Sequence, residues 1–253
     1  MTVRKSRSFL SISVAGIFLL GCQQVEKETV RRCQLLVILD KTASVNYTQK
    51  REKIHQALTR DFARTYASAT KDIQSSLLVI TGNTVVFPEP FRFDVDKPMG
   101  EEGSRIYQQS LLEWHTGKRK WLSGRIDDIC NRIDSPCRST RTDIFSIFSG
   151  IAQVQKDGGP WDSVVVDIFS DMVNTSRTFN MATDTSLNNA REKGKTVCAD
   201  LMQKGVITPV ANENLHLTIY TPDSMVNTGA VNQFWAGFFE HWGLKPNQYR
   251  FED

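Results

Sequence analysis

The feature that most constrains the fold is a continuous apolar run at residues 34–40, Gln-Leu-Leu-Val-Ile-Leu-Asp. A strand that is apolar at every position, rather than at alternate ones, is typical of a parallel sheet covered on both faces. Further strands are expected at residues 73–81, 164–170 and 215–220. Because helical segments separate them, the sequence predicts an α/β fold with a Rossmann-like, doubly wound and mostly parallel sheet.

The helices are identified by apolar residues at helical spacing. They are expected at residues 46–69, 104–133, 143–155, 188–204 and 231–242. The second of these is expected to break into two helices near Thr116 and Gly117. The last carries an aromatic stripe at Phe234, Trp235, Phe238, Phe239 and Trp242. Its spacing favours core packing against the sheet over a ligand-binding platform.

A hairpin is expected after the second strand. Gly82-Asn83 is a turn signal, and residues 84–87 after it are expected to add one antiparallel edge strand. Residues 88–102 contain several prolines and are expected to form a loop. The length of the chain is most simply that of one folded domain. We assign it to residues 34–253, with a helical insertion around residues 88–140.

The N-terminus has the pattern of an export signal. Three basic residues, Arg4, Lys5 and Arg7, precede an apolar segment at residues 9–20 that is too short to span a membrane. Residues 19–22, Leu-Leu-Gly-Cys, resemble the lipobox of bacterial lipoproteins. The alternative is a plain signal peptide followed by a chance cysteine.

The lipobox resemblance implies a membrane anchor. The signal peptide, residues 1–21, would be cut off, Cys22 would be lipidated, and residues 22–33 would tether the domain. Acyl chains on one cysteine anchor a protein stably, since each buried methylene contributes about 0.8 kcal/mol. The residue after Cys22 is Gln23 rather than aspartate. The resemblance therefore implies sorting to the outer membrane of the cell envelope, with the domain facing the periplasm.

The net charge of the chain comes from this signal. The whole chain has 31 basic and 28 acidic residues, a formal net charge of +3. Residues 1–21 hold three of the basic residues and no acid, so the rest of the chain has 28 basic and 28 acidic residues. It therefore has no net positive charge that would attract nucleic acid. The basic run Lys118-Arg119-Lys120 is short. We expect it to be a solvated helix face or to contact lipid headgroups.

The cysteines are consistent with export. Four remain after Cys22, namely Cys33, Cys130, Cys137 and Cys198. In an oxidising periplasm they could form two disulfides in three connectivities. Cys130 and Cys137 flank a predicted helix end and turn, so they form a plausible pair that leaves Cys33 with Cys198. The alternative is buried free thiols. No C-x-x-C motif is present and the histidines are scattered, which argues against zinc.

Polar side chains follow two of the predicted parallel strands. Asp40, Thr42 and Ser44 come after the first strand, and Asp171 follows the strand at residues 164–170. Thr142 precedes a helix. Ligand sites in such folds lie at the carboxyl ends of the strands. Carboxylate and hydroxyl oxygens suit Mg²⁺ or Mn²⁺, so the sequence predicts a divalent-cation site at this edge.

These motifs and their order resemble a von Willebrand factor type A domain with a metal-ion-dependent adhesion site. The family has D-x-S-x-S after the first strand, a threonine before a central helix, and an aspartate after a later strand. Three departures are Thr42 in place of serine, Met172 in place of glycine, and a longer stretch before Thr142. The resemblance implies that Thr42, Ser44 and Thr142 ligate the metal, with Asp40 and Asp171 holding it directly or through water.

The resemblance also implies the function. The cation would bind an acidic side chain of a partner protein, so the chain would be an exported, lipid-anchored protein-binding module rather than an enzyme. No Walker loop, G-x-G-x-x-G or G-x-S-x-G motif is present. The alternatives are a structural or assembly lipoprotein that uses the fold without metal, and a periplasmic hydrolase. In the metal-free alternative, Thr42 and Ser44 would cap the turn and the helix.

Overall fold

The computed structural model describes most of the predicted domain. The described residues are 32–42, 45, 47, 51–68, 72–81, 84–86, 91–94, 100–133, 141–156, 160–176, 179–181, 189–209, 213–221 and 228–252. The predicted signal peptide, residues 1–21, lies outside them, as do Cys22, Ser44 and Cys137. None of the described helices has the length and apolar content needed to cross a bilayer.

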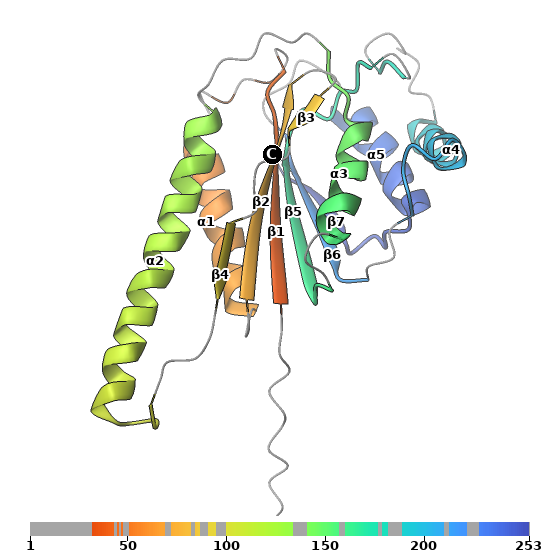
Figure 1. Cartoon of the computed structure of the whole chain (residues 1–253). Helices are drawn as coiled ribbons and strands as arrows, with labels where there is room; N and C mark the ends of the chain where they lie inside the picture. The colour runs from red at the N-terminus through yellow and green to blue at the C-terminus, as the bar shows by residue number, and fades with distance from the viewer. Residues whose placement is uncertain are drawn as a thin grey trace, which may run out of the picture.

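A sheet of five parallel strands lies at the centre of the structure, in the order β2-β1-β5-β6-β7 (Figure 1). They are β1 (Arg32–Asp40), β2 (Asp72–Thr81), β5 (Ser163–Phe169), β6 (Leu215–Tyr220) and β7 (Tyr249–Glu252). Two short strands, β3 (Thr84–Val86) and β4 (Phe91–Asp94), pair antiparallel with β2. The described chain is therefore an α/β fold with a Rossmann-like parallel sheet.

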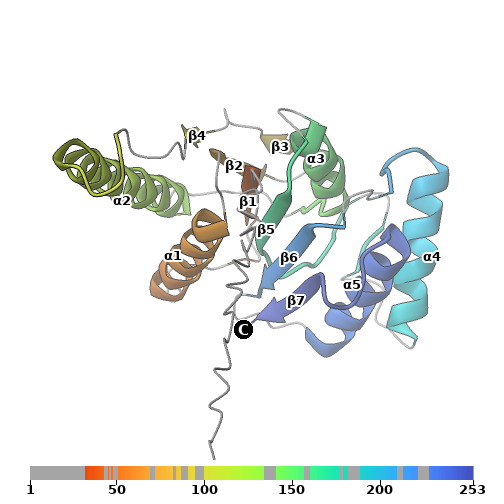
Figure 2. The same ribbon diagram turned by 90° about the horizontal axis from the view of Figure 1, so that it is seen from below.

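Helices cover both faces of the sheet (Figure 2). On one face lie α1 (Arg51–Ser68) and α2 (Arg105–Ile133), and on the other lie α3 (Phe145–Lys156), α4 (Ala190–Gln203) and α5 (Thr228–Trp242). Alternate side chains of β1 enter the two cores. Leu35 and Val37 pack in the core that includes α1 and α2, whereas Leu36 and Ile38 pack in the core that includes α3, α4 and α5. This double burial explains the continuous apolar run.

The aromatic stripe of α5 is core, as predicted, because each of its five side chains is at most 1% exposed. Two glycines let α4 and α5 touch through their backbones. A Cβ atom added at Gly194 would lie 1.9 Å from the carbonyl oxygen of Phe234. One added at Gly237 would lie 1.9 Å from the carbonyl oxygen of Arg191. Since real Cβ atoms do not approach so closely, only glycine fits at this crossing.

The expected break in the helix at residues 104–133 is wrong, because α2 is one continuous helix. An interior glycine such as Gly117 costs about 1 kcal/mol relative to alanine, which weakens a helix without ending it. Contacts four residues apart bridge the predicted break. The Thr116 hydroxyl donates to Leu112 O at 2.9 Å, and the Lys118 ammonium lies 5.2 Å from the ring centroid of Trp114.

Two strands were missed. β4 lies inside the segment expected to be a loop, and β7 was not predicted at all. Both have four residues, which is too short for a clear periodic pattern. These two strands form because each pairs with a longer neighbour: β4 pairs with β2, and β7 pairs with β6.

The predicted pairing of Cys33 with Cys198 is wrong. Cys33 packs in the core on the α1 and α2 side of the sheet, whereas Cys198 packs in the core on the opposite side. No disulfide joins the cysteines of the described residues. Cys198 is a buried free thiol, and burial raises its pKa to about 12. The pairing of Cys130 with Cys137 stays a prediction.

Candidate metal site

The site is built at the carboxyl edge of the parallel sheet. Leu39 is paired with Phe169, so the residues that follow β1 and β5 emerge side by side. Asp40 is the last residue of β1 and is fully buried. Its Oδ1 accepts a hydrogen bond from the amide of Thr42 at 2.9 Å and another from the Thr42 hydroxyl at 2.7 Å. The turn after β1 therefore folds back on its own aspartate, a conformation that aspartate favours.

Thr142 joins this group from a distant part of the chain. Its hydroxyl donates to the Thr42 hydroxyl oxygen at 2.8 Å. Its backbone is fixed by a reciprocal pair of bonds with Thr175, in which Thr142 N donates to Thr175 Oγ1 at 2.7 Å and Thr175 N donates to Thr142 O at 2.9 Å. Asp40, Thr42 and Thr142 thus form one buried chain of oxygen atoms.

The end of β5 supplies the remaining groups. The Ser170 hydroxyl donates to Asp40 Oδ2 at 2.8 Å. The next residue, Asp171, is also buried, and its Oδ1 accepts a bond from Val173 N at 3.0 Å. Ser170 was missed in the sequence, although its place as a polar residue at the end of a buried strand could have indicated it.

Met172 adopts a backbone conformation that normally favours glycine. Its φ angle is 56°, in the left-handed region, and its side chain is buried. Its backbone N–H donates to the Ser170 hydroxyl at 2.9 Å, and its carbonyl accepts from Trp235 Nε1 at 2.8 Å. The loop therefore keeps the turn that a glycine would make, at a conformational cost of about 1–2 kcal/mol.

Burial makes the negative charge of the site unfavourable. It raises the pKa of Asp40 to about 6, even though the hydrogen bonds from Thr42 and Ser170 favour the ionised form. The negative charge of Asp171 raises the pKa of Asp40 further. A cation bound between the two carboxylates would offset both effects.

The donors fit a hard divalent cation. Two buried carboxylates and several hydroxyls lie at the carboxyl edge of the sheet, and oxygen ligands of this kind suit Mg²⁺ or Mn²⁺. Within the described ranges, no group of three His, Cys, Asp or Glu side chains comes together. The candidate metal ligands among the described residues therefore include hydroxyl oxygens as well as the two carboxylates. Ser44 lies outside the described residues.

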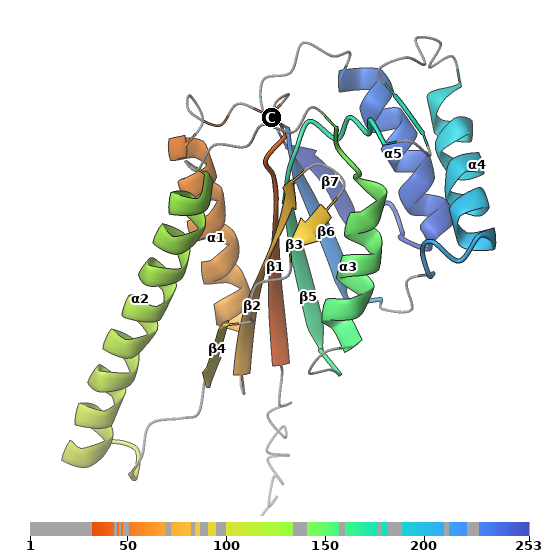
Figure 3. The same cartoon turned by 45° about the horizontal axis from the view of Figure 1, so that its top comes forward.

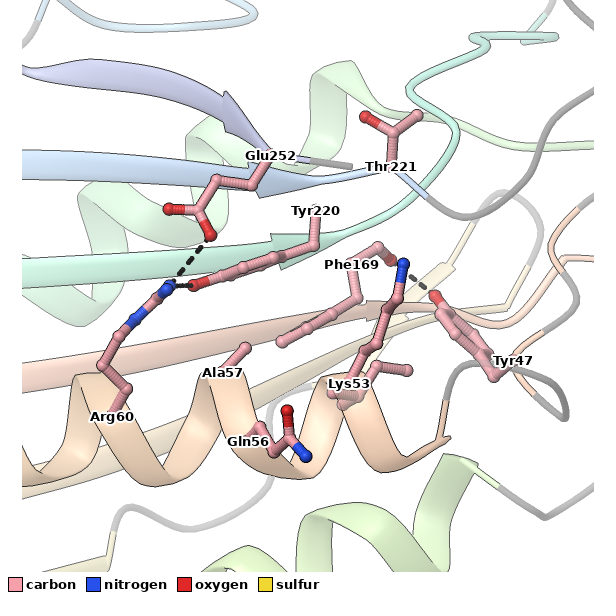
Figure 4. A pocket seen from close by; sticks show the side chains of 10 residues that line it. Tyr47, Lys53, Gln56, Ala57, Arg60, Phe169, Tyr220, Thr221 and Glu252 are labelled. Atoms are coloured by element: carbon pink, nitrogen blue, oxygen red, sulfur yellow. Dashed lines mark hydrogen bonds and ion pairs between the residues drawn. The ribbon is translucent and has the colours of Figure 1, made fainter.

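A pocket of about 360 Å³ lies beside this edge, between α1 and the ends of β5, β6 and β7 (Figure 4). Tyr47 separates the pocket from the site, because its ring lines the pocket while its hydroxyl lies 2.6 Å from Asp40 O and 2.5 Å from Phe169 O. The Phe169 ring stacks on Tyr220, with centroids 4.7 Å apart. Tyr47 was not identified from the sequence.

The chain matches no protein-family model and no curated protein sequence. Among solved structures, the manganese-loaded TRAP protein of Plasmodium vivax is 13% identical at a TM-score of 0.37, covering 88% of this chain and 69% of that one. Human COPII-coat protein Sec24c is 8% identical at a TM-score of 0.41, covering 81% and 28%. The type V pili tip protein Mfa5 of Porphyromonas gingivalis is 14% identical at a TM-score of 0.33, covering 78% and 30%.

These likenesses are distant, since all three TM-scores are below 0.5. This chain spans less than a third of the Sec24c and Mfa5 structures. Neither a family nor a ligand follows from them.

Proposed function

We propose that this chain is an exported, lipid-anchored protein-binding module that uses Mg²⁺ or Mn²⁺ to bind an acidic side chain of a partner protein. The observation that carries the proposal is the buried oxygen chain of Asp40, Thr42 and Thr142 with Asp171 beside it. A site of this kind has few anionic ligands, so a bound cation would keep its attraction for another carboxylate. The role is binding rather than catalysis.

Each residue has a separate role in this proposal. The hydroxyls of Thr42 and Thr142, with that of Ser44, would ligate the cation, and Asp40 and Asp171 would hold it directly or through water. The cation would supply the position that a partner carboxylate fills. Ser170 and the amide of Thr42 fix the orientation of the Asp40 carboxylate.

Thermal unfolding with and without metal tests the site. A cation that binds only the folded chain stabilises it by about 2.7 kcal/mol when present at 100 times its Kd. For a chain of this size that corresponds to a rise in Tm of roughly 5–11 °C. We expect such a rise with millimolar Mg²⁺ or Mn²⁺ and its reversal by chelator. Asp40→Ala should abolish the rise.

The matched control is Asp200→Asn, which removes a half-exposed carboxylate on α4 at a distance from the site. It should leave the metal-dependent rise unchanged. The absence of any rise in the wild-type chain would refute the metal site and favour a metal-free structural or assembly role. Turnover of ester or phosphate substrates would favour a periplasmic hydrolase instead.

The anchor and the partner need separate measurements. Cys22→Ser should remove labelling by fatty acid and shift the chain out of the outer-membrane fraction. A pull-down from envelope proteins should recover a partner with Mg²⁺ and lose it with chelator. Recovery that is equal under both conditions would contradict a metal-dependent interaction.

A further inference from the structure

The N-terminal half of α2 extends beyond the amino edge of the sheet. The Lys41 ammonium donates to Arg132 O, so the end of α2 lies beside the carboxyl end of β1. The 29 residues of α2 span about 43 Å, whereas the nine residues of β1 span about 30 Å. α2 runs parallel to β1, and its first turns project past the sheet at the end where the chain enters β1 (Figures 1 and 3).

The two halves of α2 have different surroundings. Trp121, Ile126 and Ile129 of the C-terminal half are buried in the core with α1 and β1. In the N-terminal half, Ile106 is 70% exposed and Leu112 is 68% exposed. Among the residues the structure describes, Val206 is the one other large exposed hydrophobic. The C-terminal half therefore holds the helix in the domain, and the N-terminal half presents apolar groups to the outside.

Basic residues surround these apolar groups. Arg105, Leu112 and Arg119 are seven residues apart, so they lie on one face of the helix, and all three are exposed. Lys120 is exposed next to them. From residue 105 to residue 120 the helix holds four basic residues and one acid, Glu113, although Glu101 and Glu102 precede it. Exposed apolar side chains with basic residues beside them are groups that can bind an anionic membrane surface.

We propose that the exposed face of α2 formed by Arg105, Ile106, Leu112, Arg119 and Lys120, the α2 arm, docks on the headgroups of an anionic membrane. Apolar side chains would enter the interface while the basic groups meet lipid phosphates. The inference rests on the proposed anchor for its geometry. Residues 22–31 reach at most about 35 Å, so an anchor at Cys22 would hold the amino edge and the α2 arm close to the bilayer.

Fluorescence on vesicles tests the docking. The full lipidated chain is reconstituted on phosphatidylcholine vesicles with or without phosphatidylglycerol, in a Cys137→Ser background because Cys33, Cys130 and Cys198 are buried. A polarity-sensitive label at Leu112→Cys should shift to the blue on the anionic vesicles. The same label at Asn131→Cys, exposed at the other end of the same helix, should not shift.

Charge reversal gives the matched comparison. Arg119→Glu with Lys120→Glu should abolish the shift at Leu112→Cys, and high salt should weaken it. Arg51→Glu with Lys53→Glu, an equal change at the start of α1, should leave it intact. An unshifted Leu112→Cys label on anionic vesicles, or self-association that buries it in their absence, overturns the proposal.

The anchor is tested separately in the same samples. Sedimentation with phosphatidylcholine vesicles reports the lipid on Cys22, whereas the shift at Leu112→Cys requires anionic lipid. If the chain fails to sediment with phosphatidylcholine vesicles but the label at Leu112→Cys shifts on anionic vesicles, the docking of the α2 arm is supported and the lipid anchor is not.

Discussion

The buried acid pair Asp61 and Asp167 gives a stability prediction whose sign can be worked out from the structure. Asp167 lies on β5, is fully buried, and neither of its carboxyl oxygens has a hydrogen-bond partner among the described residues. Burial raises its pKa well above the ordinary value, and the negative charge of Asp61 raises it further. Asp61 itself accepts a bond from the Tyr220 hydroxyl at 2.5 Å and pairs with Arg60 at 3.2 Å. Burial therefore favours the protonated form of Asp167.

The linkage between protons and folding fixes the direction of the effect. A carboxyl whose pKa is higher in the folded chain contributes its full stability below its unfolded-state pKa, about 4, and that contribution is lost as the pH rises toward the folded-state pKa. The free energy of unfolding falls by about 1.4 kcal/mol per pH unit in this window. The loss corresponds to roughly 3–6 °C in Tm per pH unit for a chain of this size.

Asp167→Asn removes this loss, because the amide has nearly the shape of the protonated carboxyl and does not ionise. The variant and the wild type should have similar stability near about pH 4, and the advantage of the variant should grow by about 1.4 kcal/mol per pH unit above it. Urea unfolding at several pH values measures the difference. The exposed Asp200→Asn serves as control and should show no such trend. A difference between Asp167→Asn and wild type that is constant with pH would refute the assignment of the proton.

Three further predictions concern packing and the site. Gly194→Ala should destabilise the chain by several kcal/mol, because the added Cβ would meet the backbone of α5. Gly124→Ala in α2 has open space around it and should stabilise the chain by about 1 kcal/mol. Thermal melts compare the two variants. Ser170→Ala should lower the free energy of unfolding by about 1–3 kcal/mol at neutral pH, since Asp40 loses a donor; an unchanged urea midpoint would contradict this. Tyr47→Phe should cost about 1–2 kcal/mol in the same assay, and wild-type stability would show that its hydroxyl bonds contribute nothing.

The sequence predicted the parts of the fold that depend on long apolar patterns. The run in β1 indicated burial on both faces, and the two cores confirm it. The position of Asp40 at a strand end follows from the same pattern. An apolar pattern does not show which distant short segments pair, so it does not predict β4 and β7. It also does not show on which face of the sheet each of Cys33 and Cys198 lies.

The candidate site was predictable to the same extent. Their places after strands or before a helix indicate the residues Asp40, Thr42, Thr142 and Asp171. The structure brings Thr42 and Thr142 into hydrogen-bond contact. Ser170 and Tyr47 act through bonds to Asp40 that only the folded chain reveals. A serine at a strand end has no sequence signal that separates it from an ordinary polar residue.

The position of β1 in the sheet has a consequence for the order of folding. β1 is the earliest strand along the described chain, yet it lies between β2 and β5, and its pairing of Cys33 with Ser163 joins residues about 130 apart. When the chain emerges N-terminus first, β1 and β2 can pair early, but the other edge of β1 waits until most of the polypeptide has appeared. Contacts of such high sequence separation slow folding and leave an apolar edge open to aggregation in the meantime. The growing chain therefore has to be protected along β1 until β5 arrives.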